Sequence, residues 1–374
     1  MELWVFDPQN NALLDIIETY SSVKLNGQYD ALGGIEFIAP LNLLDNGRMS
    51  PGMIVWPKRS AGAINEPYQE AYIIESTKLT ARAGGTELTA RGRTLSGLLA
   101  RRCLPDVRYH TGKAGLVIRR LMESVFGDTA RAFPGWSMQA SDGLGDNITL
   151  LTSGETLLEA VETVCRGSGL GYRTVFDPAT MGMQFQIYEG LDRWASDAAE
   201  PVTLNPEYDN LLGLSAEDST EEFRNVMYVI GETNAELGVT RKIVADAMLE
   251  AGGARASGLN RFEGAVRYSA ASITDGPGSA VGLPAGTSGG SVQLTEAQYQ
   301  ATMKAFAMSL LRSSARGTAI SGTLDMAQWP DLALGDIVRV RARGWDVDAA
   351  ARVRALEIRI ANGVESSYVM LGAV

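Results

Sequence analysis

Few side chains in this sequence of 374 residues could do chemistry. The one histidine, His110, lies in the polar stretch RYHTG, where we predict a solvated loop. A general base or a catalytic triad would need this imidazole held beside a nucleophile and an acid, and the stretch offers neither. The sequence therefore predicts no catalytic histidine.

Cysteine and glycine patterns give no cofactor or metal site. Cys103 and Cys165 each lie in an apolar segment with helical spacing, so we predict two reduced core thiols. No C-x-x-C, H-E-x-x-H or EF-hand spacing occurs, so no metal is expected. The glycine run at 166–173, RGSGLGYR, follows a helical pattern and precedes a strand pattern, the reverse of a dinucleotide site. We predict that it ends a helix.

Paired carboxylates are the remaining candidates, because two such groups can hydrolyse a glycosidic bond. The sequence offers two sets: Asp142 with Asp146, and Asp218 with Glu221 and Glu222. Glu221 and Glu222 follow Ser219 and Thr220, which favours the first turn of a short helix. A G-x-S-x-G elbow is absent. We predict that the chain is not an enzyme, with a peptidoglycan hydrolase as the alternative.

Tryptophans raise a second alternative, a carbohydrate-binding or receptor-binding module. Four of the six lie near Gly, Pro or Asp and are expected in loops: Trp136, Trp194, Trp329 and Trp345. Such rings could stack on a sugar, but packing in a core or an interface is the commoner use of tryptophan. The sequence leaves this alternative open.

Composition indicates a globular, strand-rich chain of two to four domains. Hydrophobic residues make up 45%, charged residues 21%, and glycine occupies 41 positions. Residues 1–100 are predicted to be strands closing on a helix capped by Thr94. Residues 101–200 are predicted to be a smaller α+β unit, and residues 201–374 strands with one long helix at about 295–315. The fold class is therefore a mixed, β-rich α+β protein.

In the middle segment, apolar residues at helical spacing predict a helix over 116–125. A second helix is expected from the T-x-x-E capping box of Thr152 and Glu155, ending at Gly167. The following DPATMG, 177–182, predicts a hairpin turn.

In the last segment, a T-x-x-Q box at Thr295 and Gln298 opens the clearest helix of the sequence. Residues 276–291, rich in Gly, Pro and Ser, are expected to be a surface excursion. Gly335 in LALGDIVRV is predicted to take a positive φ before a strand.

Charge and hydropathy limit the possible partners. The formal net charge is -11, from 33 basic and 44 acidic residues, so a phosphate-gripping surface is not expected. The opening MELWVFDPQN has no secretory pattern, and no stretch approaches the roughly 20 apolar residues of a membrane span. We expect synthesis in the cytoplasm.

Four segments, in this order, resemble the siphophage tail hub proteins, a family of tail-associated baseplate hub or distal ring proteins. They are MELWVFDPQNNALLDIIETYSS, ELTARGRTLSGLLARR, NPEYDNLLGLSAEDSTEEFRNVMYVIGE and LALGDIVRVRARGWDVDAAARVRALEIRIANGVESSYVMLGAV. Together they span nearly the whole chain.

The resemblance implies two tube-like β-barrel domains, 1–100 and 201–374, flanking the α+β insert, 101–200. Three copies would form a homotrimeric hub ring at the virion tail tip, synthesised in the host cytoplasm. The ring would continue the tail tube and contact other tail proteins, namely the distal tail or tube protein, the tape measure, and tip, fibre or wall-penetrating proteins. DNA would pass through the lumen without specific binding, which an acidic or neutral lining suits. Strands at 226–232 and 335–341 are expected to pair or pack between subunits.

Overall fold

The computed structural model describes most of the chain. The described residues are 1–41, 49–58, 70–82, 85–106, 108–152, 154–194, 201–234, 238–268, 295–314, 318–324, 332–345 and 347–372. The predicted surface excursion at 276–291 and Trp329 lie outside them.

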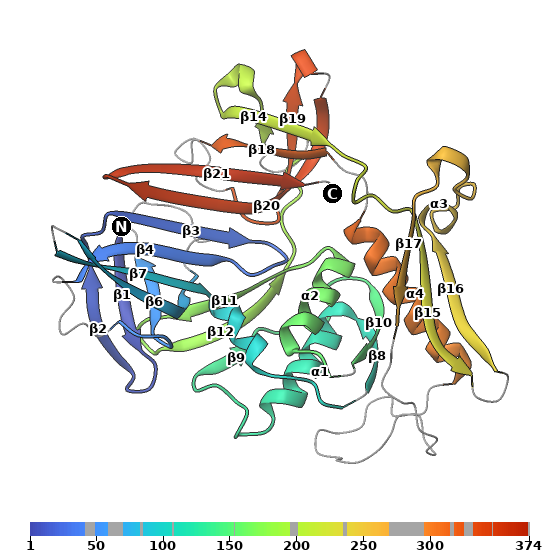
Figure 1. Cartoon of the computed structure of the whole chain (residues 1–374), viewed down its shortest axis with the longest axis horizontal. Coiled ribbons are helices and arrows are strands. Elements are labelled where there is room, and N and C mark those ends of the chain that lie inside the picture. Colours follow the sequence, from blue (N-terminus) through green and yellow to red (C-terminus); the bar gives the residue numbers. More distant parts are fainter. Residues whose placement is uncertain are drawn as a thin grey trace.

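A sheet of 13 strands forms the largest part of the molecule (Figure 1). Its strands from the first segment are β1 (Glu2–Asp7), β2 (Ala12–Ile17), β3 (Ser22–Gln28), β4 (Gly34–Pro40), β5 (Ile54–Lys58), β6 (Tyr72–Arg82) and β7 (Gly85–Thr94). Its strands from the last segment are β13 (Thr203–Leu204), β14 (Leu211–Asp218), β18 (Thr318–Leu324), β19 (Ile337–Ala342), β20 (Val347–Ala361) and β21 (Val364–Gly372). The two ends of the chain therefore build one sheet.

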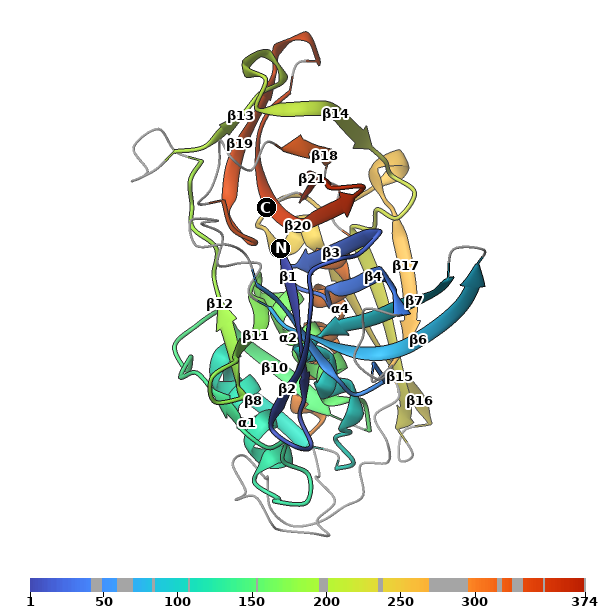
Figure 2. The same cartoon turned by 90° about the vertical axis from the view of Figure 1, so that its left-hand side faces the viewer.

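The sheet follows one open path through both segments. Eight antiparallel strands succeed one another as β14-β18-β21-β20-β3-β4-β7-β6, and Figure 2 shows them descending in this order. The pairing of β20 with β3, from Ala355 opposite Gln28 to Ala361 opposite Ser22, joins the two halves. β5 pairs with the first residues of β6, and β1 and β2 extend the sheet beyond β5. A β-rich α+β fold is confirmed; closure into two barrels stays a prediction.

Strict alternation along β3 and β4 separates a buried face of the sheet from a polar one. In β3 and β4 every second residue is buried. Among them, Val23 and Leu25 of β3 lie opposite Phe37 and Ile35 of β4. The same face continues through Leu356 and other apolar side chains of β6, β7, β20 and β21 into one hydrophobic core. A period of two is what a sheet with one dry face requires.

The middle segment folds as a smaller α+β unit, centred below the sheet in Figure 1. It contains a 3₁₀ helix (Leu95–Arg101), β8 (Arg108–Lys113), α1 (Ala114–Phe126), β9 (Trp136–Met138), β10 (Asn147–Thr152), α2 (Leu157–Ser168), β11 (Gly171–Asp177) and β12 (Gly182–Tyr188). The helix expected over 116–125 is confirmed as α1. The hairpin turn at DPATMG is confirmed between β11 and β12.

Two capping predictions in this unit are corrected. Thr152 lies in β10 with its hydroxyl on the Asp106 carbonyl, and the capping box of α2 is formed four residues later by Thr156 and Glu159. Both threonines precede a glutamate by three residues, so the pattern alone could not separate them. The helix ends at Gly169, whose φ is 67°, and not at Gly167.

Thr94 immediately precedes the 3₁₀ helix as expected, but its side chain makes no capping bond. The glycine run at 166–173 does end α2 and lead into β11, as predicted.

A third unit contains a three-stranded sheet and the long helix, at the right of Figure 1. Its elements are β15 (Val226–Asn234), β16 (Val239–Asp246), α3 (Ala247–Glu250), β17 (Glu263–Arg267) and α4 (Glu296–Ser313). The capping box of Thr295 and Gln298 is confirmed at the start of α4. Its stripe of Tyr299, Met303 and Ala307 packs against Met227 and Val229 of β15.

The strands expected to pair between subunits are inner strands. β15 lies between β16 and β17, and β19 is covered by β20 on one side and by β13 on the other. Their apolar sequences reflect neighbours on both edges and not an exposed edge. The domain limits near 100 and 200 stay a prediction.

Candidate functional site

Among the described side chains, none of the candidate catalytic carboxylates lines the depression or the cleft described below. Asp142 is held by Arg119, with its Oδ1 2.7 Å from Nε. Glu221 lies in a bend in which its backbone N–H donates to Ser219 Oγ at 3.2 Å, and the short helix predicted there does not form. Asp218 is the last residue of β14. No cluster of three or more His, Cys, Asp or Glu able to hold a metal occurs among the described residues.

One buried carboxyl was not found from the sequence. Glu70 is only 7% exposed and bridges to Val175 of β11. Burial raises its pKa to about 8, while the nearby Arg173 acts in the opposite direction. A carboxyl kept protonated near neutral pH could serve as a general acid. Glu70 lines neither the depression nor the cleft described below, so neither of them gives a substrate access to this carboxyl.

The predictions for His110 and Cys103 are wrong. His110 lies on β8 opposite Leu150 and is only 9% exposed, because a polar pentapeptide can still form a strand whose alternate side chains turn inward. Burial lowers its pKa to about 4, and the charges of Arg108 and Arg120 act in the same direction. Cys103 is exposed beside the end of the 3₁₀ helix, whereas Cys165 is buried in α2 as expected.

We expect His110 to make the protein acid-sensitive. Its folded pKa of about 4 lies below the ordinary 6.5, so the unfolded chain takes up the proton first. This contribution to stability is complete above about pH 6.5 and is lost as the pH falls toward 4, by roughly 3 kcal/mol. Urea unfolding midpoints of wild type and His110→Gln, measured between these pH values, should show a smaller slope in the variant. Equal slopes would contradict the assignment.

The three candidate tryptophans that the structure describes do not gather on one surface. Trp136 packs among Phe126, Phe133 and Phe185, while Trp194 lies under the guanidinium of Arg339. Trp345 is exposed by itself at the end of β19. Nothing in this arrangement favours a carbohydrate site.

The polar face of the large sheet is the first extended feature. Register places Arg359, Lys24, Glu36 and Arg91 side by side across β20, β3, β4 and β7. Opposite charges pair along this row: Lys24 Nζ lies 2.9 Å from Glu357, and Arg91 Nε lies 2.6 Å from Glu36. Glu357 also contacts Arg359. Each basic group has an acidic neighbour, so the face presents little net charge.

A shallow depression of about 500 Å³ continues this face over β3, β18, β20 and β21. Its lining includes Asn26, Asp30, Arg354 and Tyr368, and Asp30 pairs with Arg354 at 2.8 Å. Polar side chains whose charges are already paired bind a polyanion weakly. A polyanion can therefore lie along this face without binding to it tightly.

The second feature is a joint around Tyr29, where all three segments meet. The phenol of Tyr29 donates to the Gly169 carbonyl at 2.9 Å, and its backbone N–H donates to the Arg354 carbonyl at 2.9 Å. The ring is almost fully buried, with Tyr188 edge-on at 5.4 Å between centroids and Arg352 over it at 5.2 Å. This Tyr29 joint fixes the middle unit to both halves of the sheet.

Two glycines give the ring its space. A Cβ on Gly171 or on Gly335 would lie 2.2 Å from the Tyr29 ring. The predicted positive φ of Gly335 is confirmed at 91°. The sequence indicated the turn but not the ring packed against it.

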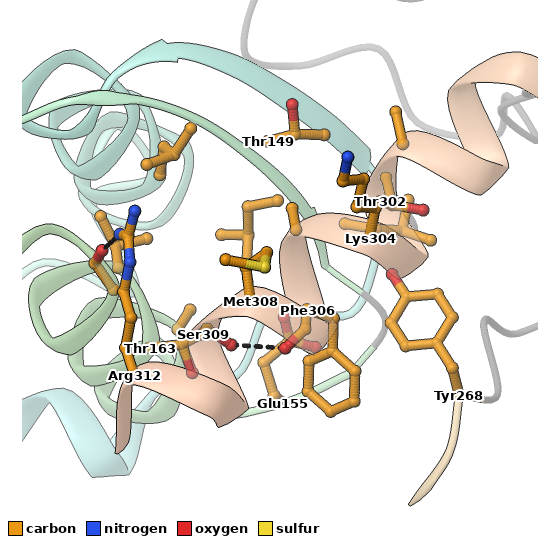
Figure 3. A pocket seen from close by; sticks show the side chains of 18 of the residues that line it. Thr149, Glu155, Thr163, Tyr268, Thr302, Lys304, Phe306, Met308, Ser309 and Arg312 are labelled. Atoms are coloured by element: carbon orange, nitrogen blue, oxygen red, sulfur yellow. Dashed lines mark hydrogen bonds between the residues drawn. The ribbon is translucent and has the colours of Figure 1, made fainter. Parts of the chain in front are cut away.

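The third feature is a cleft of about 620 Å³ between the middle and third units. Figure 3 shows α4 along one side, with Lys304 and Met308, and Thr149 of β10 on the other. Thr163 of α2 and Tyr268 lie toward its two ends. No sequence pattern predicted this cleft, because its lining comes from segments about a hundred or more residues apart.

Comparison with solved structures defines the class of fold. Among the solved structures that match almost the whole chain, three have similar lengths and TM-scores above 0.5. They are prophage tail protein gp18 from Listeria monocytogenes EGD-e (11% identity, TM-score 0.52, 100% of this chain and 94% of that chain), the tail protein from Neisseria meningitidis MC58 (12%, 0.53, 99% and 96%) and the prophage MuSo2 43 kDa tail protein from Shewanella oneidensis (10%, 0.56, 99% and 98%). The fold is that of phage tail proteins.

The family follows from the sequence itself. The model of the Siphovirus ReqiPepy6 Gp37-like protein family matches residues 2–372, and the chain belongs to this family. The resemblance to siphophage tail hub proteins is thereby confirmed. No curated protein sequence matches the chain significantly. No helix in the described part of the chain is long and apolar enough to span a membrane.

Proposed function

We propose that the chain is a structural subunit of a phage tail tip, where three copies form a hub ring that continues the tail tube. The observation that carries this proposal is the run of eight antiparallel strands in two blocks of four, β14-β18-β21-β20 and β3-β4-β7-β6. One block comes from each end of the chain. Three copies would alternate six such blocks around an axis, which adapts a six-fold tube to a three-fold tip.

The free edges of this run support ring closure. β5 pairs only with Tyr72 and Ile73, so β6 from Ser76 onward has an unpaired edge among the described residues. At the other end, β18 is the only strand that pairs with β14 in the described part of the chain. Unpaired edges bind other strands readily. Pairing of β6 in one copy with β14 in the next would join the eight-strand runs of the three copies into one closed ring.

In this ring the polar sheet face lines the lumen and DNA passes over it. The opposite face is the hydrophobic core and is filled by its own side chains. Paired charges such as Lys24 with Glu357 leave no basic track for phosphates to bind. The net charge of -11 also disfavours the binding of phosphates. The outer surfaces would contact the tube, tape-measure and tip or fibre proteins, and the chain would be made in the host cytoplasm before it enters the virion.

Neither alternative function is favoured by a particular observation. Among the described side chains, none of the carboxylates considered for a peptidoglycan hydrolase lines the depression or the cleft, and the described tryptophans considered for a sugar site lie apart. The proposal therefore remains a non-enzymatic, structural role.

Cysteine cross-linking tests the ring. In a Cys103→Ser background, Ser215→Cys on β14 is combined in turn with Ser76→Cys, Lys78→Cys or Thr80→Cys on β6. Side chains on one face of neighbouring strands lie close enough for a disulfide. We expect at least one pair to give covalent dimers and trimers that a reductant dissolves, measured by gel electrophoresis of assembled tails.

Ser215→Cys by itself is the matched control and should remain a single chain. Failure of all three pairs to cross-link in tails that contain the protein would contradict closure through these edges.

A further inference from the structure

The cleft between β10 and α4 has an unpaired strand edge along one wall. Five consecutive residues of β10, 147–151, line it. Side chains of a strand alternate between faces, so an uninterrupted run of lining residues means that the edge of the strand faces the cleft. β10 pairs with β8 only, and no backbone bond of its residues to another element is present in the described chain.

This edge lies in a recess and not on an open surface. Leu151 is buried, and Ile148, Thr149 and Leu150 are half-buried. In such surroundings backbone N–H and C=O groups are normally paired. Alternate residues of β10 direct these groups away from β8, as in any antiparallel pair. A further strand would satisfy them.

The opposite wall leaves room for that strand. α4 presents Ala301, Ala305 and Met308 on the stripe that lines the cleft, and α2 presents Ala160 and Val164. Ala160, Ala301 and Ala305 are small, and beside the larger Met308 and Phe306 the cleft keeps a volume of about 620 Å³. β10 is six residues long, or about 20 Å at roughly 3.3 Å per residue, which sets the length of a strand that could pair with it.

Basic groups indicate the chemistry of the occupant. Arg267 at the end of β17 and Arg312 of α4 line the cleft, and neither has a carboxylate partner among the described residues. Lys304 reaches Glu250 at 2.8 Å while half of its side chain stays exposed. Of the two acids in the lining, Glu159 caps α2 and Glu155 has a partner of its own. Arg312 also donates to the Gly167 carbonyl. Arg267 and Arg312 are therefore the two basic groups of the lining without a carboxylate partner in the described part of the chain.

We propose that this cleft binds an extended segment of another protein chain, which adds to β10 as a third strand and directs acidic side chains toward Arg267 and Arg312. Main-chain hydrogen bonds to the edge of β10 supply the affinity. The apolar lining of the cleft, with Arg267 and Arg312, selects the sequence of the bound segment. The source of the segment, a neighbouring protein of the same tail, rests on the proposed function.

Peptide binding to the full-length chain tests the inference. The probes are overlapping peptides of about a dozen residues that cover the other proteins of the same phage particle, measured by fluorescence polarisation. We expect an acidic, extended peptide to bind wild type. Ala305→Trp, which fills the cleft, and Arg267→Glu, which reverses its charge, should each weaken binding about ten-fold or more.

Two variants outside the lining are matched controls: Gln300→Trp on α4 and Lys242→Glu on β16, which should bind as wild type does. Hydrogen exchange should slow at residues 147–152 when the peptide is added. Absence of any binding peptide, equal binding by Ala305→Trp, or slow exchange of the β10 edge in the chain alone would overturn the inference. Ring closure is measured independently by the β6–β14 cross-links, so the cleft inference can fail while the ring stands.

Discussion

Gly335→Val is expected to destabilise the protein by about 3 kcal/mol or more. Two effects combine in this substitution. The φ of 91° lies in a region that a β-branched residue rarely adopts, and the new Cβ would lie 2.2 Å from the Tyr29 ring. The ring cannot retreat, because Gly171 lies equally close to it and Tyr188 packs edge-on against it. Overpacking of a buried aromatic adds to the backbone strain.

Gly52→Val separates the two effects. Gly52 has a similar φ of 98°, but nothing lies within 4 Å of the position of its Cβ. This control should cost only about 1 kcal/mol from backbone strain. Urea unfolding of both variants beside wild type measures the difference. Equal losses would mean that the Tyr29 joint contributes nothing beyond the turn.

Asp336→Ala is expected to cost about 3 to 5 kcal/mol. The carboxylate is 1% exposed and accepts from the backbone N–H of Leu191 at 3.0 Å and of Ala333 at 3.1 Å. It also faces Arg193, 3.4 Å away and itself buried. Removing the carboxylate leaves two N–H groups without their acceptor and takes one partner away from the buried guanidinium of Arg193. The connection between the middle unit and β19 should loosen.

Asp348→Ala is the exposed counterpart. Asp348 accepts two bonds of 2.6 Å from Arg339, but both side chains are over a third exposed, so this loss of stability should be much smaller than that at Asp336. Chemical denaturation of the two variants gives the comparison. A loss at Asp336 as small as that at Asp348 would show that the buried pair does not hold the units together.

Local chemistry explains which elements were predictable. Thr295 with Gln298, the turn at 177–182 and Gly335 act through bonds or dihedral angles within a few residues, and all three are found as predicted. Thr152 and Thr156 show the limit of such patterns. Both fit the capping box, and only the pairing of β10 with β8 decides which threonine starts the helix.

Long-range packing explains what could not be predicted. His110 is buried because β8 pairs with β10, although its neighbours in sequence are polar. The edges at β6 and β14 are visible only once β20 is seen to pair with β3 across more than three hundred residues. The polar sheet face and the cleft along β10 depend on the same distant contacts. Alternation predicted strands with one wet face, but not their order.

A cryo-electron microscopy reconstruction of the tail tip of a phage that encodes this chain tests the central claim most directly. The proposal predicts three copies in a ring around an open channel, with β6 of each copy beside β14 of the next and the polar sheet face, with Lys24 and Glu36, lining the channel. A ring with another copy number, or copies placed away from the channel as separate units, would contradict it.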